Sequence, residues 1–142
     1  MKLYFTPNAC SLAVHIVARE AGLALDLTKV DLMTHTLEDG SDFHAVNPRG
    51  YVPVLQLDDG SRHTEVSALI QHLGDQDPIG RLMPRHGSRE RFEVQQWISF
   101  VSSELHKAFS PWLWHKETAD STVKAVKEKI ATRFAELDQR LA

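Results

Sequence analysis

Residues 1–23 read MKLYFTPNACSLAVHIVAREAGL, and this stretch decides the fold. Its apolar and turn-forming residues predict a strand over Lys2–Thr6, a turn at Pro7-Asn8 and a helix over Ser11–Leu23. Cys10 is the only cysteine of the chain, and it lies where the strand turns into the helix. The chemistry of this thiol therefore depends on the start of that helix.

A thiol on the first turn of a helix faces unpaired backbone N–H groups and the positive end of the helix dipole. Both favour thiolate over thiol. The alternative interpretation is a small buried hydrophobe, but the position at the turn favours a functional thiol. Ala13 stands where the Cys-x-x-Cys pattern has its second cysteine, so Cys10 has no resolving cysteine. Any disulfide exchange must use a small thiol or another chain.

The composition is that of an ordinary globular protein, with 142 residues and a net charge of −3. We expect a cytoplasmic protein without a membrane partner, because no apolar run approaches spanning length and no signal segment or paired cysteines occur. Lysine and arginine are dispersed among acids, so no nucleic-acid partner is expected. The eight histidines lack ligand spacing with cysteine or carboxylate, so no metal site is expected.

Residues 1–77 are predicted to form an α/β domain. After the first helix, the expected elements are a strand over Asp26–Asp31, a loop over Met33–Asn47 with a short helix at Asp42–Val46, strands over Val54–Leu57 and Ser61–Thr64, and a helix over Glu65–Gln76. The Asp-Asp-Gly turn between the last two strands is a hairpin signal. The order β-α-β-α-β-β-α has two parallel strands followed by an antiparallel hairpin.

Residues 78–87 are predicted to be a linker, because they hold proline and glycine without hydrophobic periodicity. Residues 88–142 are predicted to form an all-α domain with one helix from Arg89 to about Trp114 and a second from Asp120. Each helix has a broad apolar stripe. Two helices cannot bury these stripes alone, so we expect either another protein chain or additional residues of the same protein to cover them.

Four motifs resemble the bacterial beta-class glutathione S-transferases. They are the first 23 residues, NPRGYVPVL at 47–55, DDGSRHTE at 58–65 and SSELHKAFSP at 102–111. The motifs are collinear with the family over essentially the whole chain. The resemblance implies a thioredoxin-like N-terminal domain that binds glutathione, an all-helical second domain and a homodimer. Members of the family have several further helices, so the second domain is expected to be a partial, truncated copy.

The resemblance implies a glutathione site on the first domain. Cys10 and Ser11 would lie beside the glutathione sulfur. The backbone of Val52, before a cis Pro53, would bind the cysteinyl part, although an unrelated protein would be expected to have a trans proline there.

Two further positions concern the ends of the tripeptide. Glu65 and the N–H of Val66 would hold the γ-glutamyl end, where the family usually has a small residue in place of Val66; alone, Glu65 is a plain first-turn acid. His35 stands where the family commonly has a lysine that reaches the glycyl carboxylate. Histidine is shorter and mostly neutral at pH 7, so it is expected to be a weaker anchor.

The second domain is implied to contribute a further group of residues, some across the dimer. His106 would reach towards Cys10 and the glutathione sulfur and could shuttle a proton. By itself, a lone helical histidine is more often solvated or at the edge of the core. The complete implied group is Ser99, Ser103, Glu104, His106 and Lys107. Trp112 and Trp114 are weaker candidates for an aromatic substrate pocket.

The predicted function is conjugation of glutathione to electrophilic small molecules in detoxification, with Cys10 as the glutathione-proximal thiol. Glutathione would be a co-substrate, and no prosthetic group is expected. The expected partners are glutathione, a hydrophobic electrophile and a second copy of the chain. Two alternatives stay open. One is glutathione-dependent thiol-disulfide exchange of the glutaredoxin type, and the other is a degenerate, non-catalytic relative that binds a ligand or partner.

Overall fold

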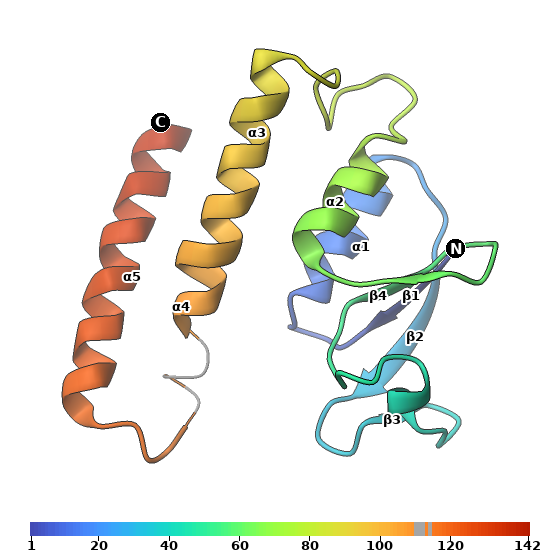
Figure 1. The fold of residues 1–142 in the computed structure, drawn as a ribbon, viewed down its shortest axis with the longest axis horizontal. Coiled ribbons are helices and arrows are strands. Elements are labelled where there is room, and N and C mark those ends of the chain that lie inside the picture. The colour runs from blue at the N-terminus through green and yellow to red at the C-terminus, as the bar shows by residue number, and fades with distance from the viewer. Residues whose placement is uncertain (110–112, 114) are drawn as a thin grey trace. The chain divides into compact units, whose positions relative to one another are not determined.

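The computed structural model describes residues 1–109, 113 and 115–142. It divides into two compact units, Met1–Arg91 and Phe92–Ala142 (Figure 1). The first unit contains the whole sheet, and the second is helical. Among the described residues, none of the helices has the length and apolar character needed to cross a membrane.

The first unit is built on a mixed sheet of five strands in the order β3-β2-β1-β4-β5. The strands are β1 (Lys2–Phe5), β2 (Asp26–Asp31), β3 (Thr36–Leu37), β4 (Val54–Gln56) and β5 (Arg62–His63). β1 pairs in parallel with β2 and antiparallel with β4, and β4 pairs antiparallel with β5. The predicted pair of parallel strands followed by a hairpin is confirmed.

Two helices, α1 (Ser11–Glu20) and α2 (Val66–Gly74), lie side by side and pack against the sheet (Figure 1). Leu3 and Leu55 point from neighbouring strands into this layer. Tyr4 and Val54 point to the opposite face, as the alternation of a strand requires. Each fully buried aliphatic side chain of this core stabilises the fold by about 1.5–3 kcal/mol.

The segment 33–47, predicted as a loop with a short helix, differs from that expectation. It contains the two-residue strand β3, which pairs antiparallel with the end of β2. The helix is a single 3-10 turn, η1 (Phe43–Ala45), whose N-cap Asp42 accepts a hydrogen bond from the N–H of His44. Elements this short have too few residues for a hydrophobic period, so the sequence pattern could not reveal them.

The segment 78–87, predicted as a linker, packs on the first unit. The guanidinium of Arg81 donates to the carbonyl of Glu20 at the end of α1, at 2.9 Å. Met83 lies against Gly74, where a Cβ would come within 2.6 Å of the methionine Cγ. A larger residue than glycine would therefore displace Met83 from the end of α2.

The second unit contains most of α3 (Arg89–Phe100) and the elements that follow it. These are the π-helical turn η2 (Val101–His106), α4 (Lys107–Phe109) and α5 (Asp120–Leu141). The predicted regular helix from Arg89 is therefore interrupted by a wide turn. The side chains of Phe109 and Phe134 pack edge to face at 6.5 Å. Trp112 and Trp114 lie outside the described residues.

A nearly buried ion pair joins the end of α2 to the start of α3. Arg91 is 4% exposed and donates two hydrogen bonds to the carboxylate of Asp75, one of them at 3.0 Å. The hydrogen bond from Arg91, together with its positive charge, holds the pKa of Asp75 below its ordinary value against the opposing effect of burial. The pair is therefore a pH-dependent contribution to the stability of the first unit.

We expect Arg91→Met to lower the free energy of unfolding by about 3 kcal/mol at pH 7, because it leaves a partly buried carboxylate without its main partner. The lowered pKa of Asp75 makes this contribution complete above the unfolded-state pKa, and it is lost as pH falls through the folded value. Urea unfolding followed by circular dichroism should show the difference from wild type shrinking below about pH 4. Arg19→Met, at an exposed arginine of α1, is the control. Equal losses for both variants would contradict the expectation.

Candidate functional site

The turn between β1 and α1 is held by a buried serine. Ser11 is fully buried, and its hydroxyl accepts from the N–H of Thr6 at 3.3 Å and donates to the carbonyl of Thr6 at 3.2 Å. The hydroxyl of Thr6 donates in turn to the carbonyl of Val30 on β2, at 2.8 Å. The turn that carries Cys10 is thus attached to two strands. The Ser11 hydroxyl therefore stabilises the turn, because it both accepts a hydrogen bond from Thr6 and donates one to it.

Cys10 is the N-cap residue of α1 and is half-buried. Its Sγ donates a hydrogen bond to the carbonyl oxygen of Val52, 3.6 Å away. The peptide bond between Val52 and Pro53 is cis, which confirms the expectation from the family. The thiol–carbonyl contact needs the thiol proton, so it exists only in the thiol form.

The loop before the cis bond is organised by Asn47, a buried residue that sequence reasoning missed. Its side-chain nitrogen donates to the carbonyl of Tyr51 at 2.7 Å, and its side-chain oxygen accepts from the N–H of Arg49 at 3.2 Å. The N–H of Gly50 donates to the Asn47 carbonyl at 2.8 Å. One side chain therefore sets the path of the chain up to Val52.

The start of α2 combines a strained backbone with a hydrogen-bonded carboxylate. Glu65 has φ 71°, in the left-handed region that costs a non-glycine residue about 1–3 kcal/mol. Its carboxylate accepts from the hydroxyl of Tyr51 at 3.0 Å. Arg49 donates to that same hydroxyl at 3.0 Å and lies 3.6 Å from the carboxylate. Tyr51 and Arg49 were not among the predicted site residues, because only the folded loop brings them to Glu65.

This end of α2 has the two charges needed to hold the head of an amino acid. The helix N-terminus, with the N–H of Val66, suits a carboxylate, and the Glu65 carboxylate suits an ammonium. The side chain of Val66 has no hydroxyl to add. The hydroxyl of Ser67, one residue further along α2, is the next group of that kind on the helix.

His35 lies in the turn between β2 and β3, next to the loop that precedes the cis bond. It is half-buried, and its backbone has φ 53°. Its ring packs on the ring of His44, with centroids 4.5 Å apart. Its Nδ1 is buried without a hydrogen-bond partner among the described residues.

The predicted residues of the second unit lie along α3, η2 and α4. Lys129 Nζ is 3.3 Å and Arg133 Nη2 is 3.1 Å from the carboxylate of Glu104. The hydrogen bonds of these two cations, that of Lys129 first, hold the pKa of Glu104 below its ordinary value. Ser103 donates to the carbonyl of Ser99 at 2.9 Å. The role of this group towards glutathione stays a prediction, including that of the exposed His106 and Lys107.

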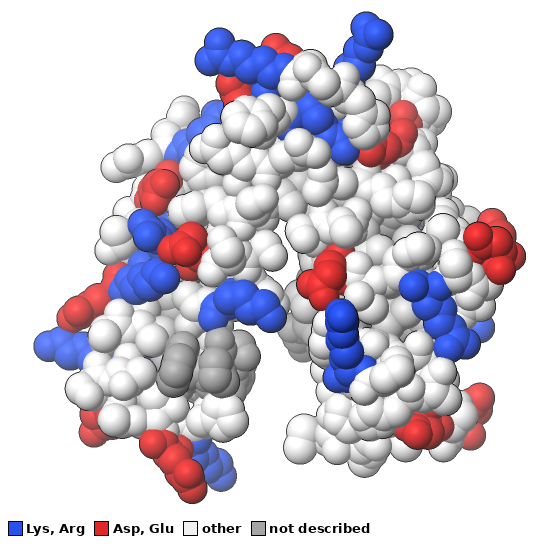
Figure 2. Space-filling view, in the orientation of Figure 1, with Lys and Arg blue, Asp and Glu red and all other residues white. Residues whose placement is uncertain are grey.

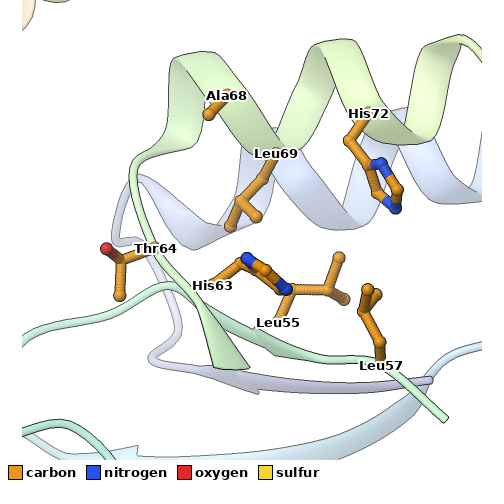
Figure 3. A pocket seen from close by; sticks show the side chains of 7 residues that line it. All are labelled: Leu55, Leu57, His63, Thr64, Ala68, Leu69 and His72. Atoms are coloured by element: carbon orange, nitrogen blue, oxygen red, sulfur yellow. The ribbon is translucent and has the colours of Figure 1, made fainter. Parts of the chain in front are cut away.

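A separate cavity of about 230 Å³, the hairpin pocket, opens between the β4–β5 hairpin and α2 (Figure 3). It is lined by Leu55, Leu57, His63, Thr64, Ala68, Leu69 and His72. None of the predicted site residues belongs to this lining.

Among the described residues, no three histidine, cysteine or acidic side chains are grouped to hold a metal ion. On the face seen in Figure 2, acidic and basic side chains are interspersed.

Comparison with known proteins identifies the class that this fold defines. Residues 9–76 match the profile described as glutathione S-transferase, N-terminal domain. The glutathione S-transferase GstA of Escherichia coli O157:H7 is 45% identical over 132 residues, which are 91% of this chain and 65% of that protein. The chain thus spans just under two thirds of the length of this relative.

Comparison with solved structures gives the same family. The ternary complex of BphK, a bacterial glutathione S-transferase, has 48% identity and a TM-score of 0.93, over 99% of this chain and 70% of that one. A sphingomonad glutathione S-transferase complexed with glutathione has 43% identity and a TM-score of 0.91 over the same shares. A beta-class enzyme from Sphingomonas chungbukensis is 44% identical, with a TM-score of 0.89. The chain belongs to the glutathione S-transferase family, and the predicted resemblance to its bacterial beta class is confirmed.

We expect Ser11→Ala to lower the free energy of unfolding by about 1–3 kcal/mol, because two backbone groups of Thr6 lose their buried partner. Chemical denaturation of the purified protein measures this loss. Ser121→Ala removes the hydroxyl of an exposed serine of α5 and is the matched control. A Ser11→Ala protein as stable as the control would show that the hydroxyl does not hold the turn.

Proposed function

We propose that this protein binds glutathione on its first unit and transfers it to a hydrophobic electrophile, with Cys10 beside the sulfur of the ligand. The observation that carries the proposal is the position of the Cys10 thiol, 3.6 Å from the carbonyl of Val52 and next to the cis bond of Pro53. It places a reactive group beside a backbone edge that can pair with an extended peptide.

The cysteinyl part of glutathione would bind along this edge. Its backbone N–H would donate to the carbonyl of Val52, and its carbonyl would accept from the N–H of Val52. The ligand then competes with the thiol of Cys10 for one acceptor. Binding would release Cys10 from Val52 and leave its thiol beside the ligand's sulfur, where either sulfur can take part in exchange or conjugation.

The γ-glutamyl end would bind at the start of α2. Its ammonium would pair with the carboxylate of Glu65, and its carboxylate would accept from the N–H of Val66. Tyr51 and Arg49 support Glu65 through the contacts at 3.0 Å and 3.6 Å. The glycyl carboxylate would pair with His35.

The second unit would complete the enzyme. We propose that His106 supports proton transfer at the glutathione sulfur and that Lys107, Ser99 and Ser103 line the site with it. Lys129 and Arg133 pair with the carboxylate of Glu104 inside the second unit. A ligand that Glu104 contacts would therefore meet a carboxylate whose charge is already partly neutralised. The use of a single cysteine without a disulfide favours a cytoplasmic location for a protein of this kind.

Thiol-disulfide exchange is a second candidate function, favoured by the half-buried thiol of Cys10 beside the peptide-binding edge. In this reaction the Cys10 thiolate attacks oxidised glutathione, forms a bond to one sulfur and expels the other as glutathione thiolate. No second cysteine exists to resolve the product, so another glutathione must do so.

The direct test compares two assays on the purified chain, one with a chloronitrobenzene and glutathione, the other with a mixed-disulfide substrate. Conjugation that Glu65→Ala strongly weakens supports the transferase. Activity on the disulfide alone supports exchange. Bound glutathione with neither activity would contradict both and indicate a non-catalytic, ligand-binding relative.

Cys10 is expected to form a mixed disulfide with glutathione, since it lies at the helix start and lacks a resolving partner. Mass spectrometry of the folded protein after incubation with oxidised glutathione should show one adduct. Cys10→Ala, the control, should show none. An unmodified wild-type protein would rule out this role for the thiol.

We also propose that the protein is a homodimer. Large apolar side chains of the second unit are exposed, among them Val101, Phe134 and Leu141, and a standard interface buries roughly 800 Å² on each partner. Light scattering over a dilution series should show a dimer that dissociates at low concentration, with weaker glutathione binding on dissociation. A monomer at all concentrations, with unchanged affinity, would contradict the proposal.

A further inference from the structure

Two imidazole rings pack against one glycine beside the proposed glutathione site. A Cβ on Gly50 would lie 2.9 Å from His44 Nε2 and 3.0 Å from His35 Cε1. Gly50 also has φ 70°, a conformation that strains other residues. The loop before the cis bond therefore comes closer to both rings than any side chain at position 50 would allow.

The partner of His44 determines which of its nitrogens carries the proton. Nδ1 of His44 lies 3.0 Å from Oδ1 of Asp42. The backbone N–H of His44, and after it the His44 side chain, hold the pKa of Asp42 below its ordinary value, so the carboxylate is ionised and can only accept. Nδ1 of His44 therefore donates to Asp42, and Nε2, on the other side of the ring, lies 2.9 Å from the Cβ position of Gly50.

The ring of His35 has a buried nitrogen that borders the same position. Its Nδ1 is buried without a partner among the described residues, and it lies 3.1 Å from the Cβ position of Gly50. Nε2 of His44 faces the same position at 2.9 Å. A cationic His35 would have a buried Nδ1–H that needs an acceptor, and Nε2 of His44, which borders the same Cβ position, is a candidate for that role.

We propose that binding of a ligand carboxylate closes a hydrogen-bonded chain from His35 through His44 to Asp42. In this chain, Nδ1–H of cationic His35 donates to Nε2 of His44, whose Nδ1–H donates to Asp42. Nε2–H of His35 donates to the glycyl carboxylate. The extra proton on His35 comes from solvent. His44 and Gly50 are positioning residues, and the inference rests on the proposed glutathione site.

The chain explains how a histidine can replace a lysine as a carboxylate anchor. A neutral imidazole donates an ordinary hydrogen bond, whereas an imidazolium donates a charge-assisted one of roughly twice the strength. The titratable groups around His35 are His44, whose ring packs on it, and Asp42, whose carboxylate interacts with it electrostatically; Arg49, beside Gly50, has a constant positive charge. Affinity for glutathione should therefore fall as pH rises above the range in which histidine is protonated, about 6.5.

The test is calorimetric titration of the whole chain at pH 6 and pH 8 with glutathione and with its monoethyl ester, in which the glycyl carboxylate is neutral. We expect wild-type affinity for glutathione to fall about tenfold between these pH values, the loss of one charge-assisted hydrogen bond. The ester should bind more weakly at pH 6 and show a smaller pH dependence. Both ligands have the same thiol, so titration of sulfur cancels in the comparison.

Three variants separate positioning from structure. His44→Phe keeps a packed ring but removes the acceptor, so glutathione should bind as weakly as the ester at pH 6. His35→Lys should bind glutathione tightly at both pH values, because lysine stays charged. His72→Phe, at an exposed histidine of α2, is the control and should behave as wild type.

Equal affinity and pH dependence for glutathione and its ester in the wild-type protein would overturn the inference and leave the proposed function standing. This comparison needs no variant, so it holds even if His44→Phe does not fold. A wild-type protein that binds neither ligand would overturn the proposed function as well.

Discussion

The buried hydroxyl of Ser11 is the contact on which the site depends. It binds both backbone groups of Thr6 and so joins the first strand to the first helix. Cys10 precedes it by one residue, and this attachment keeps the thiol facing Val52. Without this side-chain contact, the position of the sulfur would depend only on its contact with the neighbouring loop. The chemistry proposed for Cys10 therefore depends on the hydrogen bonds of the neighbouring serine.

Two further features of the first unit hold groups that the proposed ligand would use. Asn47 sets the loop that ends at the cis bond, and Glu65 holds a strained conformation at the start of α2. The strain costs about 1–3 kcal/mol, which the core beneath the two helices can sustain. In the proposed complex, the Glu65 carboxylate would pair with the ammonium of the ligand, the start of α2 with its carboxylate, and the edge at Val52 with its extended backbone. His35 would be the anchor for the glycyl carboxylate.

Hydrophobic periodicity and turn signals were enough to predict β1, β2, the hairpin and the main helices. They missed β3 and the π-helical turn η2, because two residues have no period and a wide turn keeps the helical pattern on either side. Cys10 and its helix start were legible from the sequence, and Val52 and Glu65 followed from the family resemblance. Tyr51 and His44 were not predicted, because their partners Glu65 and His35 are distant in the sequence and only the folded chain brings them together.

The most direct measurement is a titration of the isotope-labelled protein with reduced glutathione, followed by backbone amide resonances. We expect shifts that saturate together at Gly50, Val52 and Val66, which would border the bound ligand on three sides. The amides of Leu57 and His63, in the hairpin pocket, should stay unchanged. Shifts confined to the hairpin pocket, or none at all, would contradict the claim that glutathione binds at the turn of Cys10.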